Sequence, residues 1–178
     1  MLTNDLSKSL TTSECTQSFH PRELCKALGR FATGVNVVTT QHEDRTHGMT
    51  ANAFVSVSLD PPLVLLSLDN RSHMHRILPA TGRYGVSVLA EGQEALSNHF
   101  AGRAVDGLHI NFIMRHNVPL LEGAVAYFVA QVIDIHSAGD HTLYIGRVEH
   151  FEWCDRRPLL FYAGHYEQIR RNKVRPRR

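Results

Sequence analysis

Residues 48–58 suit the binding of a flat ligand with a polar edge. Small and hydroxyl side chains crowd this segment, where an ordinary barrel strand would carry larger ones. Small side chains let a planar ligand approach the backbone, and Thr50, Asn52, Ser56 and Ser58 can hydrogen-bond to its edge. A solvent-facing strand with alternating hydroxyl residues explains the pattern equally well. The segment therefore needs support from elsewhere in the chain.

A second segment, Asp69-Asn70-Arg71-Ser72, has the residue types of an anion site. It follows Ser67 at the end of a predicted strand and leads into a predicted helix. The free N–H groups and the dipole of a helix N-terminus favour negative charge. Arg71 and Ser72 can hold a phosphate there. A plain helix cap beside a solvated arginine is the simpler reading of this segment taken alone.

Several familiar catalytic motifs are missing from the sequence. There is no GxGxxG, GxSxG or HExxH, and Gly29 and Gly34 have P-loop spacing without the Lys and Ser/Thr that must follow. Among the 12 histidines, His73 and His75 are a candidate ligand pair, but side chains two positions apart diverge on a helix. We expect no metal site, no Rossmann dinucleotide site and no hydrolase triad.

Composition and charge favour an ordinary soluble protein. The chain has 178 residues, 43% of them hydrophobic and 20% charged, with a formal net charge of +2. Six of the 19 basic residues lie in residues 170–178, so the rest of the chain is mildly acidic, which argues against a nucleic-acid partner. The longest strongly apolar stretch, Pro61–Leu68, is too short to span a bilayer. We expect no membrane association.

The cysteines and the N-terminus favour a cytoplasmic location. Cys15, Cys25 and Cys154 form no CxxC pair and leave one thiol over in any disulfide scheme, which fits a reducing compartment. Residues 1–18 lack the apolar core of a signal peptide and contain eight Ser or Thr. We predict a flexible extension over 1–18, one domain over 19–169 and a basic tail over 170–178.

Short strands dominate the predicted domain. Runs rich in Val, Thr and Leu, bounded by Gly, Pro or Asp, predict strands over Val35–Thr40, Thr50–Leu59, Leu63–Leu68, Tyr84–Leu89, Ala124–His136 and His141–Trp153. Gly139-Asp140 predicts a tight hairpin between the last two. Pro61-Pro62 predicts a corner. The pattern indicates a small mainly β, Greek-key-like barrel.

One short helix is predicted before these strands, and two more interrupt them. Leu24, Leu28 and Phe31 recur at helical spacing after Pro21, which predicts an amphipathic helix that frays at Gly29. The other two helices are predicted over Ser72–Thr81, opened by a Ser cap and closed by Gly82, and over Glu91–Phe100.

The ordered set of motifs resembles the flavin reductase family, the small components of two-component flavin-dependent monooxygenases. The motifs are Gly29-Arg30-Phe31-Ala32-Thr33-Gly34-Val35, Gly48-Met49-Thr50-Ala51-Asn52-Ala53-Phe54, Ser56-Val57-Ser58-Leu59-Asp60-Pro61-Pro62, Leu96-Ser97-Asn98-His99-Phe100-Ala101-Gly102 and Gly139-Asp140-His141. The resemblance covers residues 20–168. Several motifs in the same order are far more specific than any one of them.

The resemblance implies a split β-barrel fold that binds FMN, usually as a homodimer, and that uses NADH or NADPH to reduce FMN or FAD. Carried over by position, the flavin ring would contact Met49, Thr50, Ala51, Asn52 and Ser56, and the ribityl phosphate would face Ser67, Asn70, Arg71 and Ser72. Phe100, Ala101 and Gly102 would complete the pocket. The nicotinamide would lie beside His141, Tyr162 and Tyr166.

The resemblance also implies a function: hydride transfer from reduced nicotinamide to flavin, with the reduced flavin passed to a separate oxygenase. Such chemistry mainly requires two planar rings to be stacked and shielded from water, so His141 is expected to position the nicotinamide, with proton handling as a further role. The alternatives are a reductase with a dedicated acceptor such as a corrinoid, and a non-enzymatic flavin-binding module. Many relatives carry a basic residue where His165 stands, which leaves the choice between NADH and NADPH open.

Overall fold

The computed structural model describes residues 20–169. The predictions for residues 1–18, for Cys15 and for the basic tail lie outside this range. Within it, the chain is mainly β with three short helices: α1 (Pro21–Leu28), α2 (His73–Thr81) and α3 (Glu94–Phe100). The mainly β prediction is confirmed.

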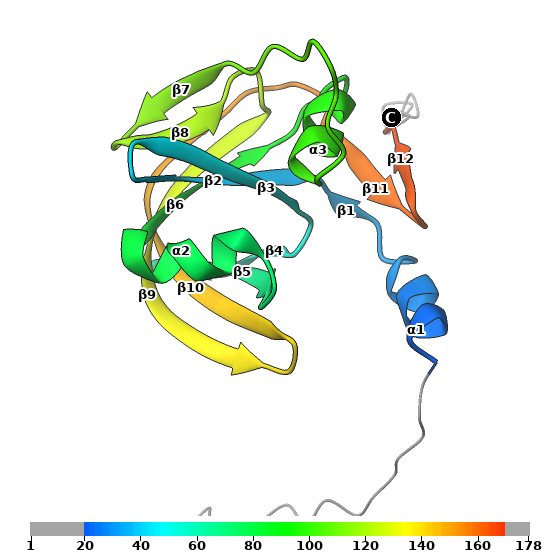
Figure 1. Cartoon of the computed structure of the whole chain (residues 1–178), viewed down its shortest axis with the longest axis horizontal. Helices are drawn as coiled ribbons and strands as arrows, with labels where there is room; N and C mark the ends of the chain where they lie inside the picture. Colours follow the sequence, from blue (N-terminus) through cyan, green and yellow to red (C-terminus); the bar gives the residue numbers. More distant parts are fainter. Residues whose placement is uncertain (1–19, 170–178) are drawn as a thin grey trace, which may run out of the picture.

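A seven-stranded antiparallel sheet forms the body (Figure 1). Its strands, in spatial order, are β3 (Arg45–Ala51), β2 (Asn36–His42), β6 (Arg83–Val88), β9 (Ala126–Ala138), β10 (His141–Trp153), β5 (Pro62–Asp69) and β4 (Phe54–Leu59). A small sheet contains β1 (Thr33–Gly34), β11 (Leu160–Tyr162) and β12 (His165–Glu167), and β7 (Phe112–Arg115) pairs with β8 (Val118–Leu121).

The two edge strands of the large sheet, β3 and β4, are consecutive in the chain. Only Asn52 and Ala53 separate them, so the sheet must curl until its opposite edges approach each other. The prediction of one continuous strand over Thr50–Leu59 is therefore wrong. The strand signal of each half is real, but a change of direction at Asn52-Ala53 sends the chain from one edge of the sheet to the other.

The main core fills the inside of this curled sheet. Tyr84, Val86 and Tyr144 from the sheet are fully buried, and α2 adds Leu78 and Met74 from its inner face. A second cluster, built around Val37, Leu89, Leu121 and Leu159, lies beneath α3 and the small sheet. The α3 helix and β11–β12 thus rest on a packed base.

The capping signals of α2 are confirmed. The Ser72 side chain accepts a hydrogen bond from the His75 N–H at 3.1 Å, and Gly82 ends the helix with φ +65°. The prediction that α3 begins at Glu91 is wrong by three residues, because Gly92 adopts φ +93° and interrupts the helical backbone.

The α1 helix forms as the periodicity predicts, but its apolar side is not covered. Leu28 is 66% exposed and Phe31 just after the helix is 79% exposed, and no residue of α1 is buried. The sequence pattern identified an apolar face of α1, and among the described residues of this chain no surface covers that face.

The turns between strands follow local chemistry. The β9–β10 hairpin is confirmed, with Ala138 paired to His141 and Gly139 at φ +64°. Pro61-Pro62 forms a tight turn rather than a corner: Asp60–Pro61 is cis, and Leu59 pairs with Pro62 across adjacent strands. Within residues 20–169, no helix is both long and apolar enough to cross a membrane.

Candidate functional site

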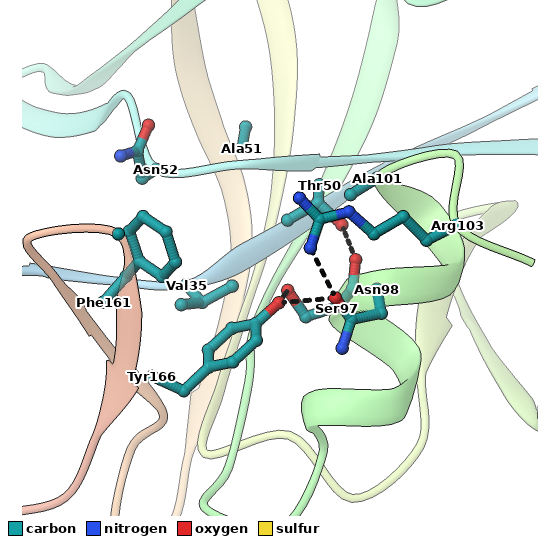
Figure 2. A pocket seen from close by; sticks show the side chains of 11 residues that line it. Val35, Thr50, Ala51, Asn52, Ser97, Asn98, Ala101, Arg103, Phe161 and Tyr166 are labelled. Atoms are coloured by element: carbon teal, nitrogen blue, oxygen red, sulfur yellow. Dashed lines mark hydrogen bonds between the residues drawn. The ribbon is translucent and has the colours of Figure 1, made fainter. Parts of the chain in front are cut away.

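A half-open cavity of about 220 Å³, here called the α3 pocket, lies where the end of β3 meets α3 and the β11–β12 hairpin (Figure 2). Three elements that are distant in sequence therefore meet at one place. Its lining consists of Val35, Thr50, Ala51, Asn52, Ser97, Asn98, Ala101, Arg103, Phe161, Gly164 and Tyr166.

Hydrogen bonds to one buried serine hold these three elements together. The Thr50 hydroxyl donates to the Ser97 carbonyl at 2.7 Å, which ties β3 to α3. The Tyr166 hydroxyl donates to Ser97 Oγ at 2.8 Å and lies 3.3 Å from Asn98 Oδ1, which ties β12 to α3 (Figure 2). Ser97 is buried, and its carbonyl and hydroxyl are both used in these bonds, so this one residue joins β3 and β12 to α3.

The walls of the α3 pocket fit a planar heteroaromatic ring. Val35 and Phe161 supply apolar surface, while Ala51, Ala101 and Gly164 carry at most a methyl group. Small-molecule pockets typically measure roughly 300–1,000 Å³, so a cavity of 220 Å³ accommodates one ring system rather than a whole dinucleotide. Asn52 adds a side-chain amide to this lining, and the Thr50 hydroxyl, which donates to Ser97, can accept a further hydrogen bond.

A second polar group of residues, here called the turn cluster, comprises Asp69–Ser72 and Asp140–Thr142. The two segments are adjacent because Asp69 at the end of β5 pairs with His141 at the start of β10. Thr142 Oγ1 donates to Asn70 Oδ1 at 2.7 Å, and the Asn70 N–H donates to the Asp140 carbonyl at 3.0 Å.

Charged side chains in the turn cluster are paired. The Arg71 guanidinium contacts both carboxylate oxygens of Asp69, with Nη2 2.7 Å from Oδ2 and Nε 3.1 Å from Oδ1. These bonds hold the pKa of the Asp69 carboxyl well below its ordinary value and raise that of Arg71. His141 Nδ1 lies 2.7 Å from Asp140 Oδ1, and this hydrogen bond lowers the pKa of the Asp140 carboxyl.

The α3 pocket and the turn cluster are joined along β3. The rings of His47 on β3 and His73 on α2 lie 4.9 Å apart, which places the start of α2 beside β3. Thr50 lies three residues further along, about 10 Å at 3.3 Å per residue. A ligand that reaches both regions would therefore place one part in the α3 pocket and another beside the start of α2, where a helix N-terminus favours an anion.

The structure brings the predicted site residues into two groups and leaves others apart. Thr50, Ala51, Asn52, Ala101 and Tyr166 line the α3 pocket, and Asn70, Arg71, Ser72 and His141 belong to the turn cluster. The other six predicted residues belong to neither group. Met49 packs on the main core, Ser56 is exposed on β4, and the Ser67 N–H donates to the Ala53 carbonyl. Phe100 lies against Gly48, Gly102 follows α3, and Tyr162 lies under Arg30.

The candidate metal ligands have other partners. His75 Nδ1 lies 2.7 Å from the Tyr144 hydroxyl, whereas His73 contacts Arg76 and the ring of His47. Among residues 20–169, no group of three or more potential ligands is arranged to hold a metal ion.

Six pocket residues were not among the predicted site residues: Val35, Ser97, Asn98, Arg103, Phe161 and Gly164. Two of them stand inside the motif that ends at Gly102, and Arg103 follows it directly. Phe161 could have been found from strand parity, because it pairs with Tyr166 across β11–β12 and must share its face, whereas Tyr162 points the other way.

A wide apolar groove adjoins the α3 pocket. It has a volume of about 1,060 Å³ and shares Asn52, Phe161 and Gly164 with the pocket. Its far wall is formed by α1 and the residues after it, including Leu28 and Phe31. The β11–β12 hairpin thus separates a small polar-edged cavity from a much larger apolar one.

Comparison with known proteins gives consistent matches. The model of the flavin reductase like domain matches residues 28–170. An NADH-dependent flavin reductase from a Rhodococcus species is 50% identical over 162 residues, covering 89% of this chain and 92% of its own. The reductase component of 4-hydroxyphenylacetate 3-monooxygenase from Thermus thermophilus is 39% identical over 137 residues, covering 77% and 88%.

Among solved structures, the flavin reductase PheA2 in its native state superimposes with a TM-score of 0.84 at 39% identity, covering 86% of this chain and all of that one. The domain model and these relatives each span most of the chain, and the residues that the domain model matches include the α3 pocket and the turn cluster. The chain therefore belongs to the flavin reductase like domain family.

Proposed function

We propose that this protein is an NAD(P)H-dependent flavin reductase that transfers a hydride from reduced nicotinamide to FMN or FAD and supplies reduced flavin to a separate oxygenase component. The observation that carries the proposal is the α3 pocket, which accepts one planar ring and stays open on one side, where a second ring can stack. Family membership and relatives that are monooxygenase reductase components support the same conclusion.

A flavin bound in the α3 pocket would supply N5 as the hydride acceptor, and the protein's own task is to position both rings. Thr50, Ala51, Asn52 and Ala101 would support the ring. The phosphate would face Asn70 and Ser72 at the start of α2, where a helix dipole favours an anion. We retain Met49, Ser56, Ser67, Arg71, Phe100 and Gly102 as further predicted flavin contacts.

The nicotinamide would be positioned by His141 and Tyr166, with Tyr162 as a further predicted contact. The Asp140 carboxylate accepts a hydrogen bond from His141 Nδ1 and so fixes the ring orientation of the histidine. Tyr166 is held by Ser97 at the edge of the α3 pocket. In this arrangement both side chains orient the hydride donor, and neither must transfer a proton for the reaction to occur.

We also propose that the protein is a homodimer with a split-barrel fold. The exposed Leu28 and Phe31 and the apolar groove beside the α3 pocket are surfaces of the kind that a second subunit covers. The approach of β3 and β4 without a ladder between them suits a barrel that is open at one seam. A cytoplasmic location agrees with the use of reduced nicotinamide nucleotides.

The activity is tested by following NADH and NADPH oxidation with no flavin, riboflavin, FMN or FAD added to the purified protein, together with its absorption spectrum. Oxidation that depends on added flavin is the expected result. A bound flavin that no nicotinamide reduces would contradict the proposal and favour a dedicated acceptor or a non-enzymatic flavin-binding module.

The residue roles are tested by two substitutions. Ser72→Ala should weaken FMN binding and leave riboflavin binding nearly unchanged, because only FMN has a phosphate at the start of α2. His141→Ala should raise the KM for NADH several-fold and leave the flavin Kd unchanged. If both variants match the wild type in these constants, the placement of the two ligands is wrong even though the family is correct.

A further inference from the structure

Arg103 brings the only formal charge among the described residues that line the α3 pocket. It follows α3 by three residues, and its guanidinium extends back over the pocket toward Thr50 and Asn98 (Figure 2). The remaining lining residues are neutral, so an anion or a developing negative charge in this pocket faces one cation.

The charge of Arg103 is not neutralised by a carboxylate in the described part of the chain. Its recorded contact is with the amide oxygen Asn98 Oδ1, at 3.4 Å from Nη1, which is long for a hydrogen bond. Arg71 in the turn cluster differs, because Asp69 binds it at 2.7 Å and shares its charge. Of these two arginines, Arg103 therefore has the charge that a ligand can use.

We propose that Arg103 stabilises the negative charge that the flavin ring gains on reduction. This inference rests on the proposed placement of the ring in the α3 pocket. In the reaction, the nicotinamide C4–H bond breaks and its electron pair and proton form the flavin N5–H bond. The nicotinamide leaves as the oxidised cation, and the flavin gains one negative charge, delocalised over N1 and the C2 carbonyl.

The position of Arg103 favours the ring over the phosphate as its partner. Arg103 shares the pocket with Ala51, Asn52 and Ala101, whereas the proposed phosphate position lies at Ser72 in the turn cluster. A cation beside a ring that is neutral before hydride transfer and anionic afterwards binds the product better than the substrate. An interaction of this kind lowers the barrier, since it strengthens as charge develops.

The test compares the binding of oxidised and chemically reduced flavin under anaerobic conditions by equilibrium titration. Riboflavin and FMN are each titrated into the wild type, Arg103→Gln, Arg103→Lys and Arg45→Gln. Arg45 is the exposed first residue of β3, at the end of the strand away from Thr50, so its substitution changes the net charge equally at a position that does not line the α3 pocket.

We expect Arg103→Gln to weaken the binding of reduced flavin about tenfold relative to oxidised flavin, which lowers the two-electron midpoint potential of the bound flavin by about 30 mV. The change should be the same for riboflavin and FMN, because it concerns the ring. Arg103→Lys should retain most of the preference for reduced flavin, and Arg45→Gln should behave as the wild type.

Three results would overturn the inference. Equal weakening of oxidised and reduced FMN with no effect on riboflavin would assign Arg103 to the phosphate. Unchanged flavin binding with a weaker affinity for NAD⁺ would assign it to the dinucleotide. Unchanged binding of all ligands would leave it with no role in the site.

Ala101→Trp separates failure of this inference from failure of the proposed site. The indole would fill the α3 pocket from its exposed wall, so it should abolish flavin binding. If Ala101→Trp binds flavin normally, the ring does not lie in the α3 pocket. The proposed position of the flavin ring and the role of Arg103 are then both refuted. If Ala101→Trp blocks binding but Arg103→Gln resembles the wild type, only the role of Arg103 is refuted.

Discussion

Replacement of Gly48 by alanine should destabilise the protein by forcing Phe100 out of its position. A Cβ at Gly48 would lie 2.6 Å from Cε1 and 2.7 Å from Cδ1 of the Phe100 ring, whereas ordinary contacts begin at 3.4 Å. The ring must therefore retreat by roughly 1 Å, and Phe112 already contacts it from another side with ring centroids 6.4 Å apart.

Overpacking of this kind costs about 1–3 kcal/mol in a packed environment. In a chain of this length, 1 kcal/mol corresponds to a fall in Tm of about 2–4 °C. Gly48→Ala should therefore decrease Tm by between a few degrees and about 10 °C. Because Phe100 immediately precedes Ala101 on the wall of the α3 pocket, the same shift should weaken flavin binding.

Urea denaturation of a double-mutant cycle identifies the clash. Phe100→Ala removes the ring atoms that the new methyl group would meet, so Gly48→Ala should cost at least 1 kcal/mol less in the Phe100→Ala background than in the wild type. The argument is refuted if Gly48→Ala leaves the urea midpoint unchanged, or if it costs the same in both backgrounds.

Two further substitutions test hydrogen bonds and ion pairs at the site. Tyr166→Phe removes the 2.8 Å bond to Ser97, so it should lower the unfolding free energy by about 1 kcal/mol and raise the KM for NADH; an unchanged KM would show that β12 does not control the pocket. Asp69→Asn removes the partner of Arg71. That pair holds the Asp69 pKa below its ordinary value of about 3.9, so the stabilisation that the pair provides is complete above this pH and declines as the pH falls below it. Acid denaturation curves of wild type and variant should therefore differ below about pH 4, after any constant offset between pH 6 and 8 is subtracted.

Local chemistry was enough to predict elements whose boundaries depend on adjacent residues. Ser72 and Gly82 bound α2 as their capping preferences require, and Gly139 turns the β9–β10 hairpin. The β3–β4 connection could not be found this way, because both sides of Asn52-Ala53 have strand propensity. Each of β3 and β4 pairs with its neighbour in sequence, and the two hairpins reach opposite edges only because β2 pairs with β6 and β5 pairs with β10, which are distant in the chain.

The site residues also divide into those that local sequence motifs predict and those that only the folded structure brings together. Contiguous motifs predicted the residues on β3 and in the turn cluster, since each lies within one short segment. The partners that complete the α3 pocket, Ser97 and Phe161, come from α3 and β11, and only long-range packing places them opposite Thr50. The α1 helix was predicted from its period, but a period cannot identify the surface that covers Leu28 and Phe31.

The junction of β3 and β4 has a consequence for the order of folding during synthesis. The two strands leave the ribosome one after the other, yet each occupies an opposite edge of a sheet whose central strands, β9 and β10, are made some 70 residues later. The α3 pocket also requires Tyr166 near the end of the described chain. A nascent chain therefore has no complete flavin site until β12 has emerged, and flavin cannot act as a template for the early stages of folding. Such non-local pairing is associated with slow folding, so the edges of β6 and β5 that wait for β9 and β10 remain exposed during translation and are the segments that a chaperone would need to protect.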